Sequence, residues 1–467
     1  MPARHHILGV AMRLFSAGCP VRLRSGAAVA VAAGLLTAGL AAPAFADDDP
    51  PQTDQLWINE PYEQTLPLAT DGGQPQSRTL GVGLYHDNEN FTVTDGRLIV
   101  DVSDLAGVAE VTWPDNCTPS GTSALCDIPV VPAIGGDYED QVFLTVHAAD
   151  SAEVGAQGRI TYEATATGGP DGSLTAPDQS FTTTLTVGAG PDLAIDPVAD
   201  IEDGQPGDER TIPFKVTNMG NESANGFTVK LYASYGLTDL TRYDACTYTT
   251  TTGNDYAPSN KALCTFDQVL APGDTFELPV PLTVRLAPHA LNERLDIDVD
   301  PGGGAQDLDS ENDYTVLQIG ADNTADFSVT GDTISGAAGE TATAELTFKN
   351  NGPAWFGNLG SGDPVATVRL IVPEGAKVTG VPSGCSPRTL VGGYYENRTG
   401  APRYDCSLRY WVLEDTQRTF AFSVRVDTVV PGAAGAVSIH PPFGEFGEYP
   451  FDFDPDLTNN TAVLAAN

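Results

Sequence analysis

The stretch CTFDQVLAPGDTFELPVPLTVRL, which runs from Cys264 to Leu286, decides the fold class. Apolar and polar residues alternate on both sides of the tetrapeptide Ala-Pro-Gly-Asp. A period of two is typical of a strand with one buried face, and Pro followed by Gly suits the second and third positions of a tight turn. The stretch therefore predicts two strands joined by a turn, with a cysteine ahead of them.

Two segments of the chain share this pattern closely, and an earlier one repeats it loosely. The alternating runs TIPFKVTN (211–218) and TAELTFKN (343–350) each lead into a polar loop, a second alternating run and a pair of cysteines. Both segments close on an Asp-x-x-Asn motif, at 309–312 and at 456–459. The first segment has the alternating runs and the cysteine pair but ends without that motif. We interpret the three segments as copies of one unit.

The composition of the chain agrees with an all-β fold. Alternating runs rich in Val, Thr, Ile and Phe are separated by frequent turn signals, and the chain contains 49 glycines and 35 prolines. Such a pattern favours β-sandwiches, and no long stretch shows the 3.6-residue apolar period of a helix. We predict a signal peptide at 1–46, an acidic flexible leader at 47–60, and three β-sandwich domains at 61–189, 190–320 and 321–467, the first being a divergent copy.

The first 46 residues have the layout of a secretory signal. Four arginines and no acid precede the apolar run GAAVAVAAGLLTAGLAA, and APAFA then ends at Ala46. The run is shorter and less hydrophobic than a membrane-spanning helix, which is the competing interpretation. We expect cleavage between Ala46 and Asp47 and a secreted, extracellular mature chain. No later segment reads as a membrane span or a sorting signal, so we expect no anchor in that chain.

The charge of the chain limits its partners. The full sequence carries a net charge of −39, and residues 47–467 contain 19 basic against 62 acidic side chains. Nucleic acids and anionic membranes need Lys and Arg to replace their counterions, so we expect the chain as a whole to be repelled by both. We interpret most acids as a solvated exterior, and divalent cations or basic partners stay open.

The cysteines form three local groups. Cys19 lies in the predicted signal, and the other six are Cys117/Cys126, Cys246/Cys264 and Cys385/Cys406. In an oxidising compartment this grouping predicts three nearest-neighbour disulfides, one per domain. A zinc site would need closely spaced cysteines or histidines, which the sequence lacks.

Several stretches carry a resemblance to a known family. FKVTNMGNES (214–223) and LTFKNNGPAW (346–355) each end a strand in an Asn-Gly loop, and DPDLTNNTAVL (454–464) is a closing strand. Together with the cysteine, turn and strand of residues 262–284, they resemble the tandem immunoglobulin-like conserved-repeat and cell-adhesion-related domains of bacterial secreted and surface proteins. The resemblance covers about residues 190–467 well and 50–189 poorly. It implies tandem immunoglobulin-like sandwiches and, by analogy, surface display or adhesion.

The sequence offers no catalytic constellation. The four histidines that follow the predicted signal occupy unrelated places in the repeats: His86, His147, His289 and His440. A triad or a metal site needs groups that converge on one pocket. No phosphate-binding loop, G-x-S-x-G elbow or H-E-x-x-H motif is present in the sequence. We therefore predict that the protein is not an enzyme.

Acid-rich stretches are the candidate metal sites. RLDIDVD (294–300) alternates acids with apolar residues, and two acidic loops follow in the second and third domains. Calcium prefers six to eight oxygen ligands, which such loops can supply, although no EF-hand register is present. Acids that alternate with Ile or Val are also typical of a strand with one solvated face. The candidate calcium ligands are Asp307, Asp309, Asp313, Asp452, Asp454 and Asp456.

Aromatic residues of the third domain allow a second kind of site. They are Trp355, Phe356, Tyr394, Tyr395, Phe446, Tyr449, Phe451 and Phe453. Exposed rings could stack on sugars, whereas packing at the end of a sandwich or between domains is the alternative that we favour.

The sequence predicts a secreted, non-catalytic protein that acts as a structural spacer or adhesion-type module at the cell exterior. The alternative is a calcium-dependent or carbohydrate-binding extracellular protein. Loops at sandwich ends are the freest to vary, and the disulfide-bounded loops Cys246–Cys264 and Cys385–Cys406 are the longest. We expect these two loops to contact the partner, an unidentified protein or a cell-wall or glycan ligand.

Overall fold

The computed structural model describes residues 52–68, 76–134, 139–177, 181–252, 256–441, 443–444, 447–448 and 451–466. The predicted signal peptide and the beginning of the predicted leader lie outside these residues. Within them the regular structure is almost wholly β, apart from two short 3₁₀ turns, η1 (Ser103–Leu105) and η2 (Leu457–Asn460). Over the same residues, no helix has the length and the hydrophobicity needed to cross a membrane.

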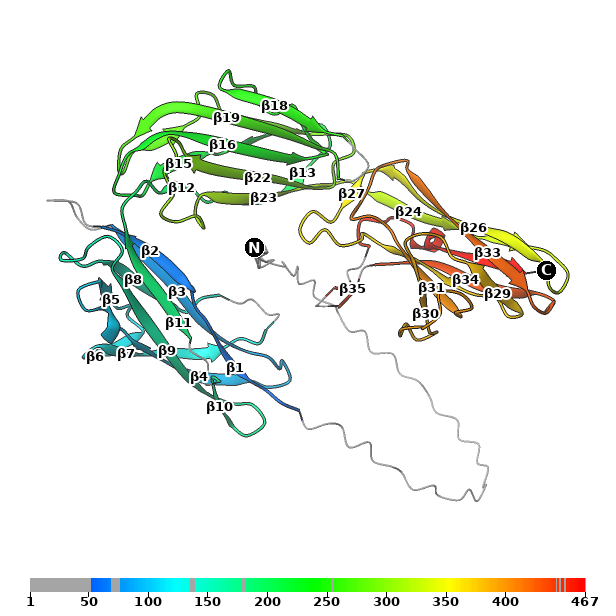
Figure 1. The fold of residues 1–467 in the computed structure, drawn as a ribbon, viewed down its shortest axis with the longest axis horizontal. Helices are drawn as coiled ribbons and strands as arrows, with labels where there is room; N and C mark the ends of the chain where they lie inside the picture. The colour runs from blue at the N-terminus through cyan, green and yellow to red at the C-terminus, as the bar shows by residue number, and fades with distance from the viewer. Residues whose placement is uncertain are drawn as a thin grey trace, which may run out of the picture. The chain divides into compact units, whose positions relative to one another are not determined.

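The first sandwich contains strands β1–β11 (blue to teal in Figure 1). Their bounds are β1 (Leu56–Asn59), β2 (Glu63–Pro67), β3 (Ser77–His86), β4 (Val93–Asp101), β5 (Ala109–Thr112), β6 (Cys117–Ser120), β7 (Ser123–Val131), β8 (Val142–Ala148), β9 (Gln157–Thr167), β10 (Ser173–Thr175) and β11 (Thr182–Gly188). One sheet has the order β1-β3-β8-β5, and the other has the order β2-β11-β9-β4-β7-β6, with β10 beside β9.

The second sandwich contains strands β12–β23 (green in Figure 1). Their bounds are β12 (Leu193–Ile195), β13 (Ile201–Gly204), β14 (Glu209–Ile212), β15 (Lys215–Asn218), β16 (Ala224–Ser234), β17 (Leu237–Thr238), β18 (Cys246–Thr251), β19 (Ser259–Leu270), β20 (Thr275–Glu277), β21 (Leu282–Leu286), β22 (Asn292–Pro301) and β23 (Tyr314–Ala321). The large sheet has the order β13-β23-β22-β16-β19-β18, and the opposite layer is divided into β12-β15-β20 and β14-β21-β17.

The third sandwich contains strands β24–β37 (yellow to red in Figure 1). Their bounds are β24 (Ala325–Thr330), β25 (Asp332–Ile334), β26 (Thr341–Pro353), β27 (Phe356–Gly357), β28 (Thr367–Ile371), β29 (Ala376–Gly380), β30 (Cys385–Arg388), β31 (Arg403–Ser407), β32 (Trp411–Val412), β33 (Gln417–Val426), β34 (Ala433–His440), β35 (Phe443–Gly444), β36 (Gly447–Glu448) and β37 (Thr461–Ala466). Its two main sheets have the orders β25-β37-β34-β28-β31-β30 and β24-β26-β33-β29, and β27-β32 and β35-β36 form two small ribbons.

The large sheets of the three sandwiches share one six-strand topology. In each, an early strand pairs in parallel with the last strand of the sandwich: β2 with β11, β13 with β23, and β25 with β37. The other four strands of each sheet follow that last strand as antiparallel neighbours, in the same order in all three sandwiches. The first segment has this topology too, although its sequence matches the other two poorly. The predicted fold class, tandem immunoglobulin-like β-sandwiches, is confirmed.

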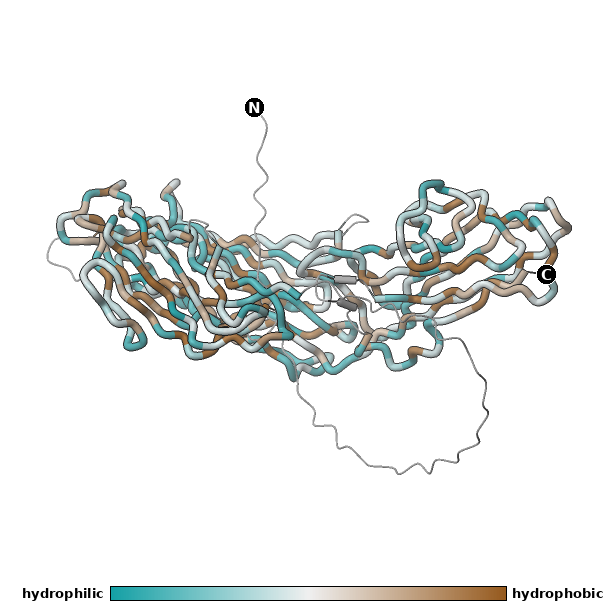
Figure 2. Tube along the Cα trace, turned by 90° about the horizontal axis from the view of Figure 1, so that it is seen from below, coloured by the Kyte–Doolittle hydropathy of each residue, from teal (hydrophilic) through white to brown (hydrophobic). Residues whose placement is uncertain are grey.

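The alternating sequence explains the layers. Hydrophobic and hydrophilic residues alternate along the strands, as Figure 2 shows. Strand β9 is the clearest case, because buried and exposed side chains alternate along all eleven of its residues. Each sandwich encloses its own apolar cluster of buried Leu, Val, Ile, Ala and aromatic side chains. Side chains that alternate in this way place one apolar face against the opposite sheet and leave the other in water.

The disulfides join the predicted partners in each sandwich, Cys117–Cys126, Cys246–Cys264 and Cys385–Cys406. In every case the two cysteines lie directly opposite each other on the last two strands of the large sheet. The bond therefore fixes an edge strand to its neighbour. The outermost strand of a sheet has only one partner strand, so this covalent link supplements its hydrogen bonds.

The turn inside the opening stretch forms as predicted. The backbone N–H of Asp274 donates to the carbonyl of Ala271 at 2.9 Å, and the Asp274 carboxylate accepts from the N–H of Ala271 at 3.0 Å. Gly273 has φ +82°, which the third position of a type II turn requires. The turn connects β19 to β20, which belong to different sheets, so it carries the chain from one layer to the other.

The predicted flexible leader, 47–60, is wrong at its C-terminal end. Residues 56–59 form β1, which pairs with β3 and places Leu56 and Ile58 in the core of the first sandwich. The short sequence LWIN does alternate, which indicates a strand. The acidic residues before it favoured the prediction of a flexible leader.

Candidate functional site

The first predicted contact loop, Cys246–Cys264, is largely a hairpin. Strand β18 pairs with β19 from Cys246 opposite Cys264 to Thr251 opposite Ser259. The segment was expected to be a contact loop, and most of it is strand. Threonine has a high preference for strands, and here that preference prevails.

The second predicted contact loop, Cys385–Cys406, has a strand-paired base and an irregular outer part. Strand β30 pairs with β31 from Cys385 opposite Cys406 to Arg388 opposite Arg403. Beyond this base the chain makes a tight turn in which the N–H of Gly392 donates to the carbonyl of Thr389 at 3.0 Å. The N–H of Gly393 also donates to Oγ1 of Thr389, at 2.9 Å. Local hydrogen bonds therefore order the turn from Thr389 to Gly393.

Apolar side chains are exposed at the tip of this loop, the 389–394 tip. Leu390 is 61% exposed, Val391 is 93% exposed and Tyr394 is 79% exposed. Leu390 and Val391 are the two central residues of the turn, where Gly, Pro, Asn and Asp are the usual choices. The length of this loop predicted a contact surface, but Leu390 and Val391 were not among the predicted residues. Two adjacent aliphatic residues between Thr389 and Gly392 were the signal that could have found them.

The stretch of sequence around this tip is rich in basic residues, in an otherwise acidic chain. Residues 377–413 contain five basic and two acidic side chains, against 14 and 60 in the rest of residues 47–467. Arg398 donates to the carbonyl of Val381 at 3.3 Å, and Arg403 is ion-paired with Asp405. Lys377, on strand β29, contributes a further cation. The sequence around the tip therefore has a net charge opposite in sign to that of the whole chain.

The other predicted aromatics of the third sandwich mostly pack inside it. Trp355 is 1% exposed, and Phe356 and Phe453 stack with ring centroids 4.2 Å apart. Phe451 packs edge-on against Phe327. Packing, the favoured alternative in the sequence analysis, is confirmed for these residues. Tyr395 is half-buried and donates to the carbonyl of Gly400 at 3.1 Å, while Phe446 and Tyr449 lie outside the described residues.

The candidate calcium ligands of the second sandwich are engaged in protein contacts. Asp307 accepts from the N–H of Leu193 at 2.8 Å, and its other carboxylate oxygen accepts from the N–H of Asp309 at 3.0 Å. Asp309 accepts from Gln64 of the first sandwich at 2.9 Å and faces the guanidinium of Arg78. The positive charge beside these acids therefore comes from Arg78.

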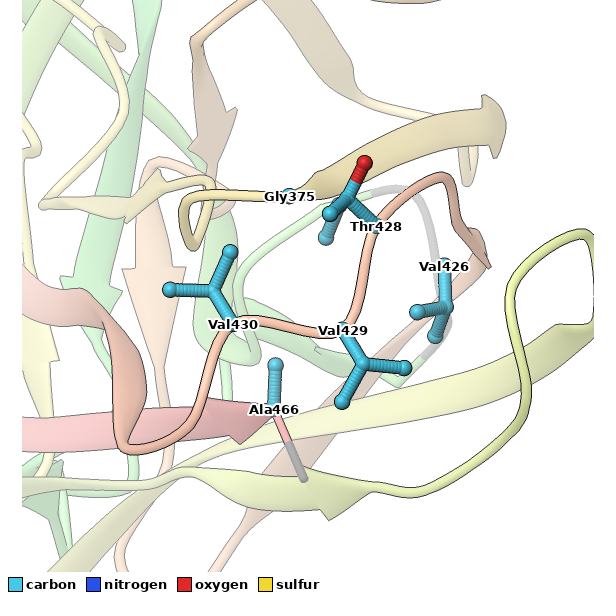
Figure 3. A pocket seen from close by; sticks show the side chains of 7 residues that line it. Gly375, Val426, Thr428, Val429, Val430 and Ala466 are labelled. Atoms are coloured by element: carbon cyan, nitrogen blue, oxygen red, sulfur yellow. The ribbon is translucent and has the colours of Figure 1, made fainter.

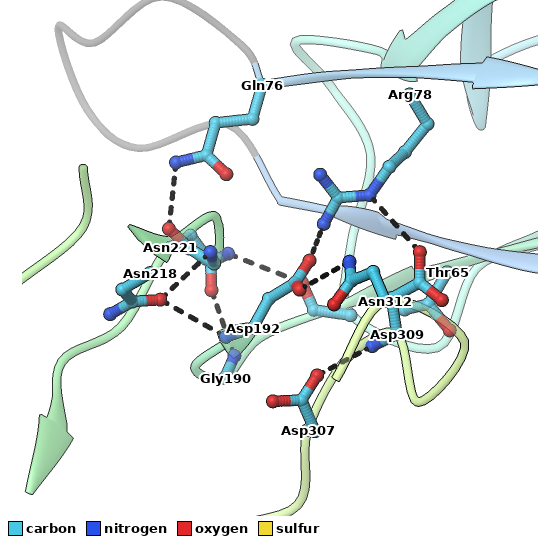
Figure 4. Close-up of polar contacts among 12 residues, drawn as sticks. Thr65, Gln76, Arg78, Gly190, Asp192, Asn218, Asn221, Asp307, Asp309 and Asn312 are labelled. Atoms are coloured by element: carbon cyan, nitrogen blue, oxygen red, sulfur yellow. Dashed lines mark hydrogen bonds and ion pairs between the residues drawn. The ribbon is translucent and has the colours of Figure 1, made fainter. Parts of the chain in front are cut away.

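Arg78 is the centre of the polar contacts between the first two sandwiches, which Figure 4 shows. It is 8% exposed and forms an ion pair with Asp192, which is fully buried. The second oxygen of Asp192 accepts from Asn312 at 2.9 Å. Nearby, Gln76 donates to the carbonyl of Gly220 at 2.8 Å. The sequence analysis did not identify Arg78, because one basic residue in an alternating run carries no sign of burial.

Asp313, another candidate ligand, lies in a crowded acidic environment. Partial burial is the largest cause that raises its pKa to about 7, and repulsion from Asp307, Asp298, Asp300 and Asp309 adds to the effect. Lys230 is ion-paired with Asp298 and Asp300 and offsets part of this negative charge.

The candidate ligands of the third sandwich have mainly structural contacts. Asp454 accepts from the N–H of Phe327 at 3.3 Å and from Asn460 at 2.9 Å. Asp456 accepts from the N–H of Thr458 at 3.1 Å and caps the turn η2, and Asp452 is exposed. Throughout the described part of the chain, no group of three or more His, Cys, Asp or Glu side chains is placed to hold a metal ion.

The four histidines lie apart from one another, each with its own neighbours. His86 is buried beside Asp54, with Nδ1 3.1 Å from the carboxylate, and His147 lies 3.6 Å from Glu110. His289 stacks on Tyr235, and Ser438 lies within hydrogen-bond distance of His440. The described histidines therefore form no shared site.

A buried carboxylate, Glu293, links the second and third sandwiches. Trp355 of the third sandwich donates its indole N–H to Glu293 at 2.6 Å. The N–H groups of Gly236 and Leu291 donate to the same carboxylate at 2.8 and 3.1 Å, and Ser234 donates its hydroxyl. Burial raises the pKa of Glu293, and these hydrogen bonds offset part of the increase. All its donors are supplied by the protein, so Glu293 has a structural role.

Two hollows were compared as ligand sites. Figure 3 shows one of about 10 Å³ between Gly375, residues 426–430 and Ala466, and this volume admits no more than a water molecule. The other, of about 360 Å³, is lined partly by Arg294, Asp296 and Tyr410. Arg294 already donates to Asp296 at 2.8 Å and to the carbonyl of Leu359 at 3.2 Å. The 389–394 tip, in contrast, carries exposed apolar side chains, of which Val391 at 93% has the largest exposed fraction among the large hydrophobic residues described.

No known family model and no curated protein matches this sequence. Among solved structures, the chain is similar to a protein of Corynebacterium diphtheriae described as membrane-anchored, with 10% identity, 89% of this chain and 91% of that chain covered, and a TM-score of 0.18. It is also similar to the complex of Dpr2 Ig1-Ig2 with DIP-Theta Ig1-Ig3, with 10% identity, 88% and 99% covered, and a TM-score of 0.22. A third likeness is to CBD12 from CALX1.2, with 12% identity, 59% and 100% covered, and a TM-score of 0.18. Scores this low carry no argument about function.

Proposed function

We propose that this protein is a secreted, non-catalytic interaction module of the cell exterior that binds its partner through the 389–394 tip. The exposure of Val391, at 93%, is the observation that carries the proposal. An aliphatic side chain at the centre of an ordered turn gains nothing from the fold of its own domain. Leu390 and Tyr394 are exposed beside it, and neighbouring exposed apolar side chains support a contact site there.

Three features support an extracellular setting and an adhesion-type role. The first 46 residues read as an export signal, and the three disulfides suit an oxidising compartment. The repeat motifs at residues 214–223 and 346–355 resemble those of bacterial surface repeats.

Sedimentation with washed cell envelopes of the producing organism tests the proposal. We expect the mature chain to pellet with envelopes and the variant Val391→Asp to stay largely in the supernatant. The matched control is Val154→Asp, because Val154 is also an exposed valine, at 59%, but lies in the first sandwich. Equal pelleting of the mature chain and Val391→Asp would contradict the proposal. Parallel samples with calcium or chelator test the calcium-dependent alternative directly.

A further inference from the structure

We propose that the 389–394 tip binds an anionic lipid surface, with Leu390, Val391 and Tyr394 entering the headgroup region. This inference names the partner of the contact site proposed above and therefore rests on that function. It concerns one loop, whereas the expectation that acids repel an anionic membrane concerned the chain as a whole.

The side chains at the tip suit the lipid interface. Leu390 and Val391 provide adjacent aliphatic groups, and Tyr394 combines an apolar ring with a polar hydroxyl. Aliphatic and aromatic side chains bind at the boundary between headgroups and acyl chains, and Tyr is enriched there. A backbone bridge pairs Arg388 with Tyr394, which places Tyr394 directly after the turn. The tip therefore carries three exposed apolar side chains within five residues.

Part of the backbone of the turn is hydrogen-bonded within the loop, which favours insertion. The N–H of Thr389 donates to the carbonyl of Gly393 at 3.0 Å, and the N–H of Gly392 donates back to Thr389 at 3.0 Å. The hydroxyl of Thr389 accepts from the N–H of Gly393 at 2.9 Å. Unpaired backbone groups are costly where water is scarce, and these three bonds inside the loop lower that cost. The disulfide Cys385–Cys406 fixes the base of the loop.

The basic side chains give the tip a preference for anionic lipid. The disulfide-bounded loop contains Arg388, Arg398 and Arg403 against Glu396 and Asp405, and Lys377 and Arg409 lie just outside it in sequence. Arg403 is ion-paired with Asp405, which leaves Arg388 and Arg398 as the cations of the loop toward a headgroup. Basic residues near a membrane surface are attracted by anionic headgroups. The many acids elsewhere in the chain act weakly at the tip, because the screening length at physiological salt is about 8 Å. Local and net charge can therefore act in opposite directions.

The size of the apolar tip favours lipid over a protein partner. A specific protein interface buries at least about 1,000 Å² in total and needs a complementary surface. Three side chains on one turn fall short of that area. A bilayer adapts to the shape of the inserted group, so a small protruding tip is sufficient there. An anionic glycan would use the cations but would leave Leu390 and Val391 without an apolar environment.

Vesicle co-sedimentation of the mature chain tests the assignment. We expect pelleting with phosphatidylcholine vesicles that contain phosphatidylglycerol and little with phosphatidylcholine alone. Val391→Asp should weaken binding by roughly tenfold, because burial of a valine is worth about that factor. Arg388→Glu should also weaken it, mainly at low salt. Val154→Asp is the matched control and should bind like the wild type.

The two proposals can fail separately. If the wild type ignores anionic vesicles while Val391→Asp is released from envelopes, the lipid assignment is overturned and the contact site stands. A protein or glycan is then the partner. If Val391→Asp and Val154→Asp weaken vesicle binding equally, the tip is not the lipid contact. If Val391→Asp does not alter envelope pelleting, the proposed contact site is wrong.

Discussion

The side-chain amide of Asn350 makes the same contacts in the third sandwich as that of Asn218 makes in the second. Both residues are fully buried. Asn218 donates to the carbonyl of Leu270 at 2.8 Å, and Asn350 donates to that of Leu413 at 3.2 Å. The oxygen of each accepts from an N–H two residues later, at 3.0 and 2.9 Å. The buried Asn of the repeated Asn-x-Gly sequence thus hydrogen-bonds its own loop to another segment of the sandwich. That segment is the end of β19 in the second sandwich and the residue after β32 in the third.

We expect Asn350→Ala to destabilise the third sandwich. The substitution leaves the carbonyls of Leu413 and Ala354 and the N–H of Gly352 without their partner. Each buried group left unpaired costs about 1–3 kcal/mol. Calorimetry of the full mature chain should show the transition of this sandwich at a lower temperature. Asn351→Ala is the matched control, since Asn351 is exposed and should have a small effect; equal shifts would rule out this role for Asn350.

Breaking the ion pair between Arg78 and Asp192 should destabilise the chain strongly. Both side chains are buried, so Arg78→Met leaves the Asp192 carboxylate without its cation. Loss of one partner of a buried pair costs about 3–5 kcal/mol. Urea denaturation should report the loss, and Arg97→Met, at an exposed position of β4, should leave the transition nearly unchanged. If Arg78→Met lowers the free energy of unfolding by less than about 1 kcal/mol, the loss is far below the ~3–5 kcal/mol expected. That result would mean that water replaces the guanidinium.

The acidic group around Asp313 should make stability fall as pH rises. Burial and the neighbouring acids raise the folded-state pKa of Asp313 from 3.8 to about 7. The unfolded chain therefore releases this proton first, and its contribution to stability, complete below about pH 4, is lost on the way to about pH 7. Asn cannot titrate, so Asp313→Asn removes this pH-dependent contribution. The melting temperature of the variant should therefore change less with pH. Asp267→Asn, at an exposed acid of β19, should retain the wild-type profile; an unchanged profile for Asp313→Asn would contradict the assignment.

The fold was predictable because its signals are local. Alternation identifies strands, and the separations of the cysteines, 9, 18 and 21 residues, predict the pairing. The hairpin of β18 was missed because threonine suits both turns and strands, and only pairing with β19 decides between them. Arg78 was missed for a related reason. Burial of a charge depends on a partner from another sandwich, Asp192, more than one hundred residues later.

The candidate site was predictable only in part. Cysteine spacing identified the loop that contains the 389–394 tip, but exposure of Val391 depends on the turn around it. Acids such as Asp307 suggested calcium because carboxylates look alike in a sequence, whether they bind a metal or backbone N–H groups. The distinction comes from Leu193, whose N–H donates to Asp307 at 2.8 Å.

Removal of the disulfide Cys385–Cys406 should destabilise the third sandwich and loosen the loop. In the chain-entropy model, a bond that closes a loop with a separation of 21 residues contributes about 3 kcal/mol. We expect the Cys385→Ser/Cys406→Ser double variant to lose about that much stability and to be cleaved faster by trypsin after Arg398. The matched control is Cys117→Ser/Cys126→Ser, which should leave cleavage at Arg398 unchanged. If the first variant is cleaved no faster than the wild type, the hydrogen bonds between Thr389 and Gly393 order the loop alone, and the disulfide serves only the edge strand.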